Sequence, residues 1–372
     1  MPGCLPRECL ECFATSYYGR RQGSDRIQRS GTKLYSQCLR KLNSCLRAPG
    51  SSMASETVMS IIILTICEYL VATSPTAWIE HMHGLAAYFR FKGLEIFRQP
   101  LILELFESTR FQMITAAVAS RQATFLASDS WETEPWRIAG VAKNAVQFLI
   151  DLAAKIPALY VDFIQYLKTA DPIMKEQMSV ALEVNMAILF EKFQQWHHEW
   201  EKENDPVIQR VALSSEEQQY YGVSSKLAFV SIDHMFTEVH YLQSLIILLE
   251  LWKTFRGAAV KLTPDAQDDQ SCASEEIETA RSAPLPSTTS LHMESHTAAQ
   301  EICRIIINCL QPSGRLAYVV QFILAMRMAL IVLRQEEGNL QVTWLEDCLQ
   351  RSSEITHGWD IGKIAMQSYQ LA

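Results

Sequence analysis

Glycine and proline are scarce in this sequence, with 14 glycines and 13 prolines among 372 residues. Both residues interrupt helices, so their scarcity leaves room for long uninterrupted ones. Runs in which apolar and polar residues alternate, which are typical of half-buried strands, are also few. The length is sufficient for two average domains or for one large helical domain. We therefore predict an all-α fold in which stacked antiparallel helical hairpins form one large helical domain.

Motifs that carry chemistry are missing as well. The sequence contains no Gly-x-Ser-x-Gly elbow for a nucleophilic serine, and no glycine-rich loop that leads into a helix and could hold a phosphate. Asp129 and Glu132 lie close together, but neighbouring carboxylates are common in loops. A reaction needs a nucleophile, an orienting base and donors for the developing charge. The sequence therefore predicts no enzyme, no catalytic residue and no cofactor-binding residue.

The ten cysteines do not form a recognisable metal site. Cys9 and Cys12 form one C-x-x-C pair, Cys4 lies nearby, and Cys38 and Cys45 follow on the apolar face of an expected helix. A binuclear zinc cluster needs six closely spaced thiolates, so this spacing is wrong and we predict no metal. Residues 1–20 also lack the apolar run of a secretory signal, which favours a reducing, intracellular compartment.

The histidines give no better metal site. His81 and His83 are two residues apart, and His197 and His198 are adjacent. Such pairs do not share a helix face, whereas a helical zinc site needs two histidines at i and i+4. We expect His81 and His83 to make hydrogen bonds inside a helix packing interface.

The charge is distributed unevenly. The net charge is −8, but residues 1–50 carry nine Lys or Arg against three Asp or Glu, which leaves −14 on the remainder. A basic segment beside an acidic body is typical either of a nucleic-acid or targeting signal or of a solvated terminus. Because the cations are scattered, we favour the second interpretation and predict a flexible basic arm over residues 1–31.

Two apolar runs have almost the length of a membrane span. Residues 58–72 are short and contain Glu68, and residues 316–333 contain Arg327. A span needs about 20 nearly uncharged residues, and a charge at mid-bilayer is costly. Both runs predict buried helices of a soluble protein with no membrane contact.

Helical periodicity sets the expected elements. Ser74 and Pro75 predict the start of a helix that ends at Gly93 and carries Trp78 on its apolar stripe. Residues 128–135 predict a loop, residues 206–222 an irregular segment, and the acidic, Pro- and Ser-rich residues 264–290 a disordered insertion. The remaining expected helices cover residues 33–46, 56–72, 101–126 with a break near 108, 140–155, 158–169, 172–202, 224–255, 291–310, 316–336, 343–351 and 360–369.

Aromatic residues at helical spacing could line a ligand pocket between helices. The more common role of such residues is in the core, which is the role we predict here. The tryptophans concerned are Trp78, Trp131, Trp136, Trp196, Trp200 and Trp252.

An ordered set of residues between Ser74 and Trp136 resembles a known family. It consists of Ser74-Pro75-Thr76-Ala77-Trp78, His81 to Ala87, Arg110-Phe111-Gln112, Arg121 to Leu126, and Trp131 to Trp136. This order is similar to the regulatory domain of fungal zinc-cluster transcription factors, in the second of its common subfamilies. The resemblance covers residues from about 34 to the C-terminus, with Trp344-Leu345 and Gly358 to Gly362 at its end. It implies an all-α fold at residues 32–372 and regulation of transcription.

The chain departs from that family because it lacks the zinc cluster that reads DNA. We therefore expect a nuclear transcription regulator that acts through protein partners, either a zinc-cluster transcription factor or a second copy, and that contacts DNA only indirectly. Control of a fungal secondary-metabolite gene cluster is compatible with this role. One alternative is a helical ligand-binding or scaffolding module without a transcriptional role. Another is a zinc-cluster transcription factor whose gene model is incomplete because its first exon, which encodes the zinc cluster, is missing; the 5′ end of the transcript would reveal it.

Overall fold

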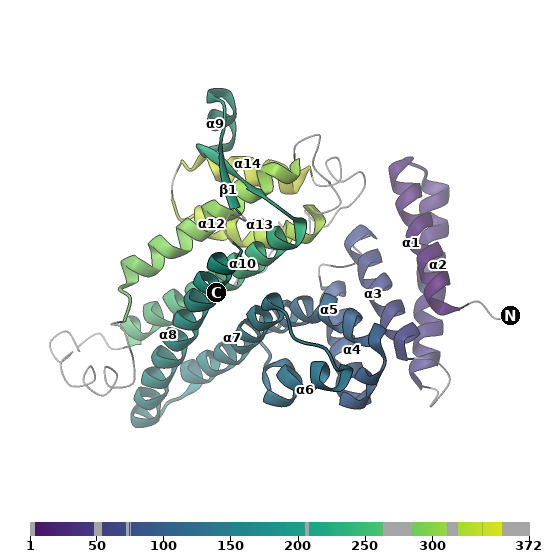
Figure 1. Cartoon of the computed structure of the whole chain (residues 1–372), viewed down its shortest axis with the longest axis horizontal. Helices are drawn as coiled ribbons and strands as arrows, with labels where there is room; N and C mark the ends of the chain where they lie inside the picture. Colours follow the sequence, from purple (N-terminus) through teal and green to yellow (C-terminus); the bar gives the residue numbers. More distant parts are fainter. Residues whose placement is uncertain are drawn as a thin grey trace.

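The computed structural model describes residues 4–47, 54–71, 74, 76–204, 208–262, 285–310, 319–336 and 338–351. Apart from one two-stranded sheet, the regular elements in these residues are helices, so the predicted all-α class is confirmed. Successive helices pack beside each other from one edge of the molecule inward (Figure 1).

The N-terminal edge is a hairpin of two long helices, α1 (Leu5–Arg21) and α2 (Asp25–Arg47), and it packs on α3 (Ala54–Val71). The flexible arm expected at residues 1–31 is therefore wrong for residues 5–31. Gly19 and Gly31 are packing residues: a Cβ on Gly19 would lie 2.8 Å from the backbone nitrogen of Gln28, and one on Gly31 would lie 3.1 Å from Cα of Ser16. Small residues at these positions let the two helices approach closely.

A second hairpin joins α3 to α4 (Ala77–Lys92). The N-cap residue of α4 is Thr76, without a side-chain cap hydrogen bond, so the cap expected at Ser74 is wrong; Pro75 lies outside the described residues. Gly93 ends α4 with φ of 70°, a backbone conformation that favours glycine. α3 is the one described helix long and apolar enough to cross a membrane, and 67% of that stretch is buried inside the fold.

The next helix is α5 (Pro100–Ala119), which lies in the sequence between the 3₁₀ turns η1 (Leu94–Arg98) and η2 (Phe125–Ala127). α5 runs through Ser108 without the expected break and ends seven residues earlier than predicted, at Ala119. The loop expected at residues 128–135 is also wrong, because α6 (Asp129–Ala139) occupies this position. Acidic residues in its first turn suit the helix dipole, and Gly140 ends it in the left-handed conformation.

Two long helices, α7 (Ala145–Lys168) and α8 (Pro172–Glu203), form the next hairpin. Two helices were expected in place of α7, divided before Ala158. Pro157 is instead buried inside one continuous helix, where packing outweighs its helix-breaking tendency. The side chain of Asp171 caps α8 by accepting from the backbone N–H of Ile173 at 3.0 Å.

A two-stranded sheet and a short helix follow α8, where an irregular segment was expected at residues 206–222. The antiparallel strands β1 (Ile208–Ala212) and β2 (Ser225–Phe229) pair in register from Ile208 opposite Phe229 to Ala212 opposite Ser225. Between them lies α9 (Ser215–Tyr221), which begins with a capping box of Ser214 and Glu217.

The helix expected from residue 224 begins later, as α10 (Ile232–Leu262). It packs against α12 (Thr288–Leu310) and α13 (Val319–Leu333), and α14 (Leu340–Gln350) closes this end. α12 starts inside the insertion expected at residues 264–290, of which 264–284 lie outside the described residues, as does the helix expected at 360–369.

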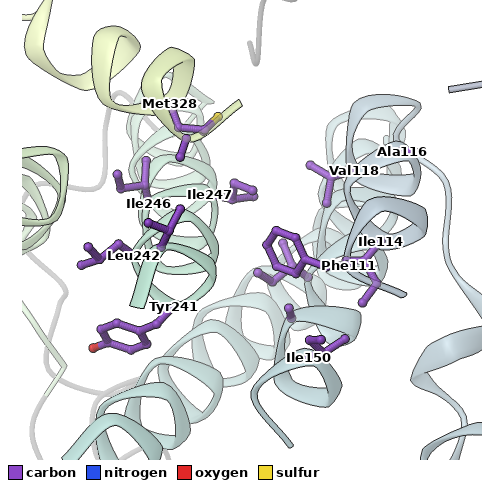
Figure 2. Close-up of a cluster of buried hydrophobic side chains, with 14 of the residues drawn as sticks. Phe111, Ile114, Ala116, Val118, Ile150, Tyr241, Leu242, Ile246, Ile247 and Met328 are labelled. Atoms are coloured by element: carbon purple, nitrogen blue, oxygen red, sulfur yellow. The ribbon is translucent and has the colours of Figure 1, made fainter. Parts of the chain in front are cut away.

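One continuous hydrophobic core runs through the described helices. In the close-up of Figure 2, Phe111 and Ile114 of α5 and Ile150 of α7 lie opposite Leu242 and Ile246 of α10. The core therefore connects the N-terminal hairpins to the C-terminal helices.

Candidate functional site

Four buried thiols lie at the seam between the α1–α2 hairpin and α3. Cys9 and Cys12 belong to α1, Cys38 to α2 and Cys67 to α3, and they interact with one another. Burial raises the pKa of the Cys9 and Cys38 thiols. Because the thiolate is the reactive form, Cys9 and Cys38 act as small hydrophobes that pack the seam, whereas a hydrogen bond with Cys67 lowers the pKa of Cys12.

Cys9 and Cys12 therefore do not lie in a flexible terminus, which corrects the expectation for residues 1–31, whereas Cys38 lies on the apolar face of a helix as expected. Cys45 is half-buried and Cys4 is exposed, so neither joins the four thiols in full burial. Within the described ranges, no group of three or more His, Cys, Asp or Glu side chains is arranged to hold a metal ion.

Beside the thiols, three polar side chains from three helices form a buried chain of hydrogen bonds. The Tyr35 hydroxyl of α2 donates to the carboxylate of Glu68 in α3, and its oxygen lies 2.9 Å from Nε2 of His81 in α4. Burial lowers the pKa of His81, against an opposing effect of Glu68. A neutral His81 with its proton on Nε2 can donate to the Tyr35 oxygen, which completes the chain. This cluster fastens the N-terminal hairpin to the body of the fold.

A larger charged network surrounds Arg110 of α5, which is fully buried. Its guanidinium donates to Asp151 Oδ1 at 2.6 Å and to Gln147 Oε1 at 2.9 Å, both on α7. Lys143 also pairs with Asp151. The carboxylate of Asp151 compensates the charge of both cations away from water, although Arg110 and Lys143 repel each other.

The Trp136 ring lies against this network. The Arg110 guanidinium carbon lies 4.8 Å and the Lys143 ammonium 4.4 Å from the ring centroid, within range for cation–π attraction. Trp136 Nε1 donates to Glu107 Oε1 at 2.6 Å. Residues that the resemblance singled out, Arg110 and Trp136, are thus direct neighbours, and their contacts hold α5, α6 and α7 together.

The carboxylates considered as candidate acids have different places. Glu132 accepts from Lys155, whose ammonium also donates to the backbone oxygen of Ala127 at 2.7 Å. Asp129 is exposed in the first turn of α6. The two carboxylates therefore have separate roles, with Glu132 in an ion pair and Asp129 at a helix start.

The histidine pairs do not converge. His83 Nε2 lies 3.1 Å from Ser120 Oγ, away from the partners of His81. His197 Nε2 lies 2.9 Å from Glu238 Oε2, whereas His198 is exposed. Each partnered histidine thus makes a separate contact between helices, as was expected for His81 and His83.

The tryptophans contribute to the core. Trp136, Trp200 and Trp252 are buried, and Trp78, Trp131 and Trp196 are half-buried and pack against the core. Trp131 makes an edge-to-face contact with Phe125 at 4.5 Å between ring centroids. The predicted packing role is confirmed, with Trp78 less buried than its stripe suggested.

Sequence reasoning missed Tyr35, Lys143 and Asp151. Tyr35 lies 33 residues from Glu68 and 46 from His81, and Asp151 lies 41 residues from Arg110. A charged residue inside an apolar helix indicates that it has a partner in the fold, because buried charges are paired. This signal does not identify the residue that is the partner.

Comparisons with known proteins give a similarity over part of the chain. No family model matches the chain, and no solved structure matches it. An uncharacterized protein of Emericella nidulans is 26% identical over 132 residues, which are 36% of this chain and 28% of that protein. The matched segment thus spans less than a third of that relative's length. The relative has no described activity that could be carried over to this chain.

Proposed function

We propose that this protein regulates transcription in the nucleus through protein partners. The observation that supports it best is the meeting of separate residues of the resemblance, Arg110 and Trp136, in one buried contact. In the resembling family these residues belong to a helical regulatory domain. Their burial here gives them a scaffold role, as expected of a domain that works through its surface.

The buried polar groups support a regulatory role over catalysis. Tyr35, Glu68 and His81 bind one another, and Arg110 and Asp151 do the same. Groups engaged in this way hold helices together and are shielded from a substrate. A partner, either a zinc-cluster transcription factor or a second copy, would meet the exposed helix faces instead.

Deletion of the gene tests the proposal. Transcript levels are compared in the parent, in the deletion strain, and in the deletion strain carrying the gene again, with a fluorescent tag to locate the protein. A defined set of transcripts should change on deletion and return on complementation, and the tagged protein should lie in the nucleus. Unchanged transcripts together with a cytoplasmic protein would refute the role and favour the ligand-binding or scaffolding alternative.

A further inference from the structure

The outer face of α2 carries a row of cations. Arg26, Arg29, Lys33, Arg40 and Arg47 are all exposed, and their spacings of three, four and seven residues put them on one side of the helix. At ~1.5 Å per residue the row is about 32 Å long. α2 lies next to α1 at the edge of the molecule (Figure 1), and the exposure of the five side chains places this face on the surface.

These five cations have no ion-pair partner among the described residues. Arg29 Nε donates only to the backbone oxygen of Asp25 in its own helix, at 3.2 Å. Lys41 is also exposed but differs from the row, because it pairs with Glu8 of α1 at 2.5 Å. No carboxylate of the described residues therefore neutralises the row.

The rest of this face is suited to phosphate. Between the cations it exposes the amide of Asn43, a common partner of phosphate oxygens, while the hydroxyls of Ser36 and Ser44 donate to the backbone oxygens of Thr32 and Arg40. The one acidic residue of α2 is Asp25, at its first position. Repulsion of a polyanion along the row is thus small.

Other anionic surfaces fit less well. The apolar face of α2, with Tyr35, Cys38 and Leu42, is buried, and Leu46 is the one large apolar side chain that α2 exposes. A helix that binds a membrane surface needs an apolar face free to enter it. Tyr35, the only aromatic residue of α2, is buried, which leaves none on the row to stack on the bases of a single strand.

We infer that the outer face of α2 binds the phosphate backbone of duplex DNA without reading its sequence. A duplex presents a regular line of charges, about one per 1.7 Å of axis, which a straight row of cations can follow. The net charge of −14 on the chain outside residues 1–50 repels the same duplex, so α2 is the side that contacts it. This contact is direct, unlike the indirect one expected from the sequence, and the choice of DNA over duplex RNA rests on the proposed function.

Salt-dependent binding of the full chain tests the inference. Fluorescence anisotropy is measured with an arbitrary duplex of about 30 base pairs at about 50 to about 200 mM NaCl, because releasing counterions makes log K fall with log salt by ~0.9 per phosphate contact. The wild type should bind with Kd of about 1–100 µM near physiological salt. With one phosphate contact for each of the five cations, the slope of log K against log salt can reach about −4.5 at most.

A triple substitution locates the contact. Arg29→Gln, Lys33→Gln and Arg40→Gln together should reduce the slope to about −2 and weaken binding at least tenfold at low salt. The matched control changes three exposed lysines on α7 and α8, by the same net charge, and should bind like the wild type. The control substitutions are Lys168→Gln, Lys192→Gln and Lys202→Gln.

Four results would overturn the inference. The first is no binding by the wild type at low salt, and the second is equal loss in both triple variants. The third is tighter binding to phosphatidylserine vesicles than to DNA. The fourth is a wild-type dimer, measured by light scattering, that the triple α2 variant no longer forms although it still binds DNA. In that case a second copy of the chain, and not DNA, would cover α2. If transcripts change on deletion of the gene but the protein does not bind DNA, the DNA contact at α2 is refuted while the proposed function in transcription is still supported.

Discussion

Replacing Gly19 by alanine tests whether the N-terminal hairpin is packed as described. In an unpacked helix, alanine is favoured over glycine by ~1 kcal/mol. In the structure, the new Cβ would lie 2.8 Å from the backbone nitrogen of Gln28 and 3.0 Å from Cγ2 of Ile27. A backbone atom cannot rotate away, and overpacking of this kind costs about 1–3 kcal/mol. We therefore expect a net destabilisation of about 1 kcal/mol.

The matched control is Gly84→Ala in α4, where an added Cβ meets nothing within 4 Å. That variant should be stabilised by about 0.5–1 kcal/mol, which separates the two variants by about 2 kcal/mol. Urea unfolding followed by circular dichroism measures both, and limited proteolysis reports on the hairpin itself. If Gly19→Ala is as stabilising as Gly84→Ala, residues 5–31 are not packed in this hairpin and the account of the seam is refuted.

Three further substitutions test the buried groups. Asp151→Ala leaves Arg110 buried without its carboxylate and should cost about 3–5 kcal/mol in urea unfolding, while a loss below about 1 kcal/mol would mean that the network is open to water. Burial opposes protonation of His197, but Glu238 raises its pKa overall, so this contact stabilises the fold at acidic pH and the gain is lost as pH rises through the folded pKa. The stability gap between wild type and His197→Gln should thus narrow from pH ~6 to ~8, and a constant gap would contradict the pairing. Trp78→Ala should cost less than the roughly 3–5 kcal/mol of a fully buried aromatic, because Trp78 is half-buried, and a larger loss in melting experiments would show deeper burial.

Local sequence signals located much of the fold. The start of α8 at Pro172 was predicted correctly, because Asp171 and Pro172 form a strong N-terminal signal. The helix end predicted near Pro157 was wrong, because the burial of Pro157 inside α7 outweighs the tendency of proline to break a helix. The flexible arm predicted for residues 1–31 was wrong for a different reason, since a glycine such as Gly19 permits either a flexible chain or a close helix contact. The distinction depends on a neighbour that only the tertiary structure supplies.

The buried clusters were predictable only in part. The resemblance drew attention to Arg110, Trp136 and His81, but it gave none of their contacts. Asp151 and Tyr35 are ordinary residues of amphipathic helices until folding brings them to their partners. Pairings over such separations follow from helix packing, which one sequence does not encode in a local pattern.

Chromatin immunoprecipitation of the tagged full-length protein tests the central claim most directly. Enrichment is expected at the promoters of those genes whose transcripts change when the gene is deleted, because a partner that reads sequence would bring the protein to them. Absence of enrichment at those promoters, with the protein present in the nucleus, would contradict regulation of transcription through partners bound at its target genes.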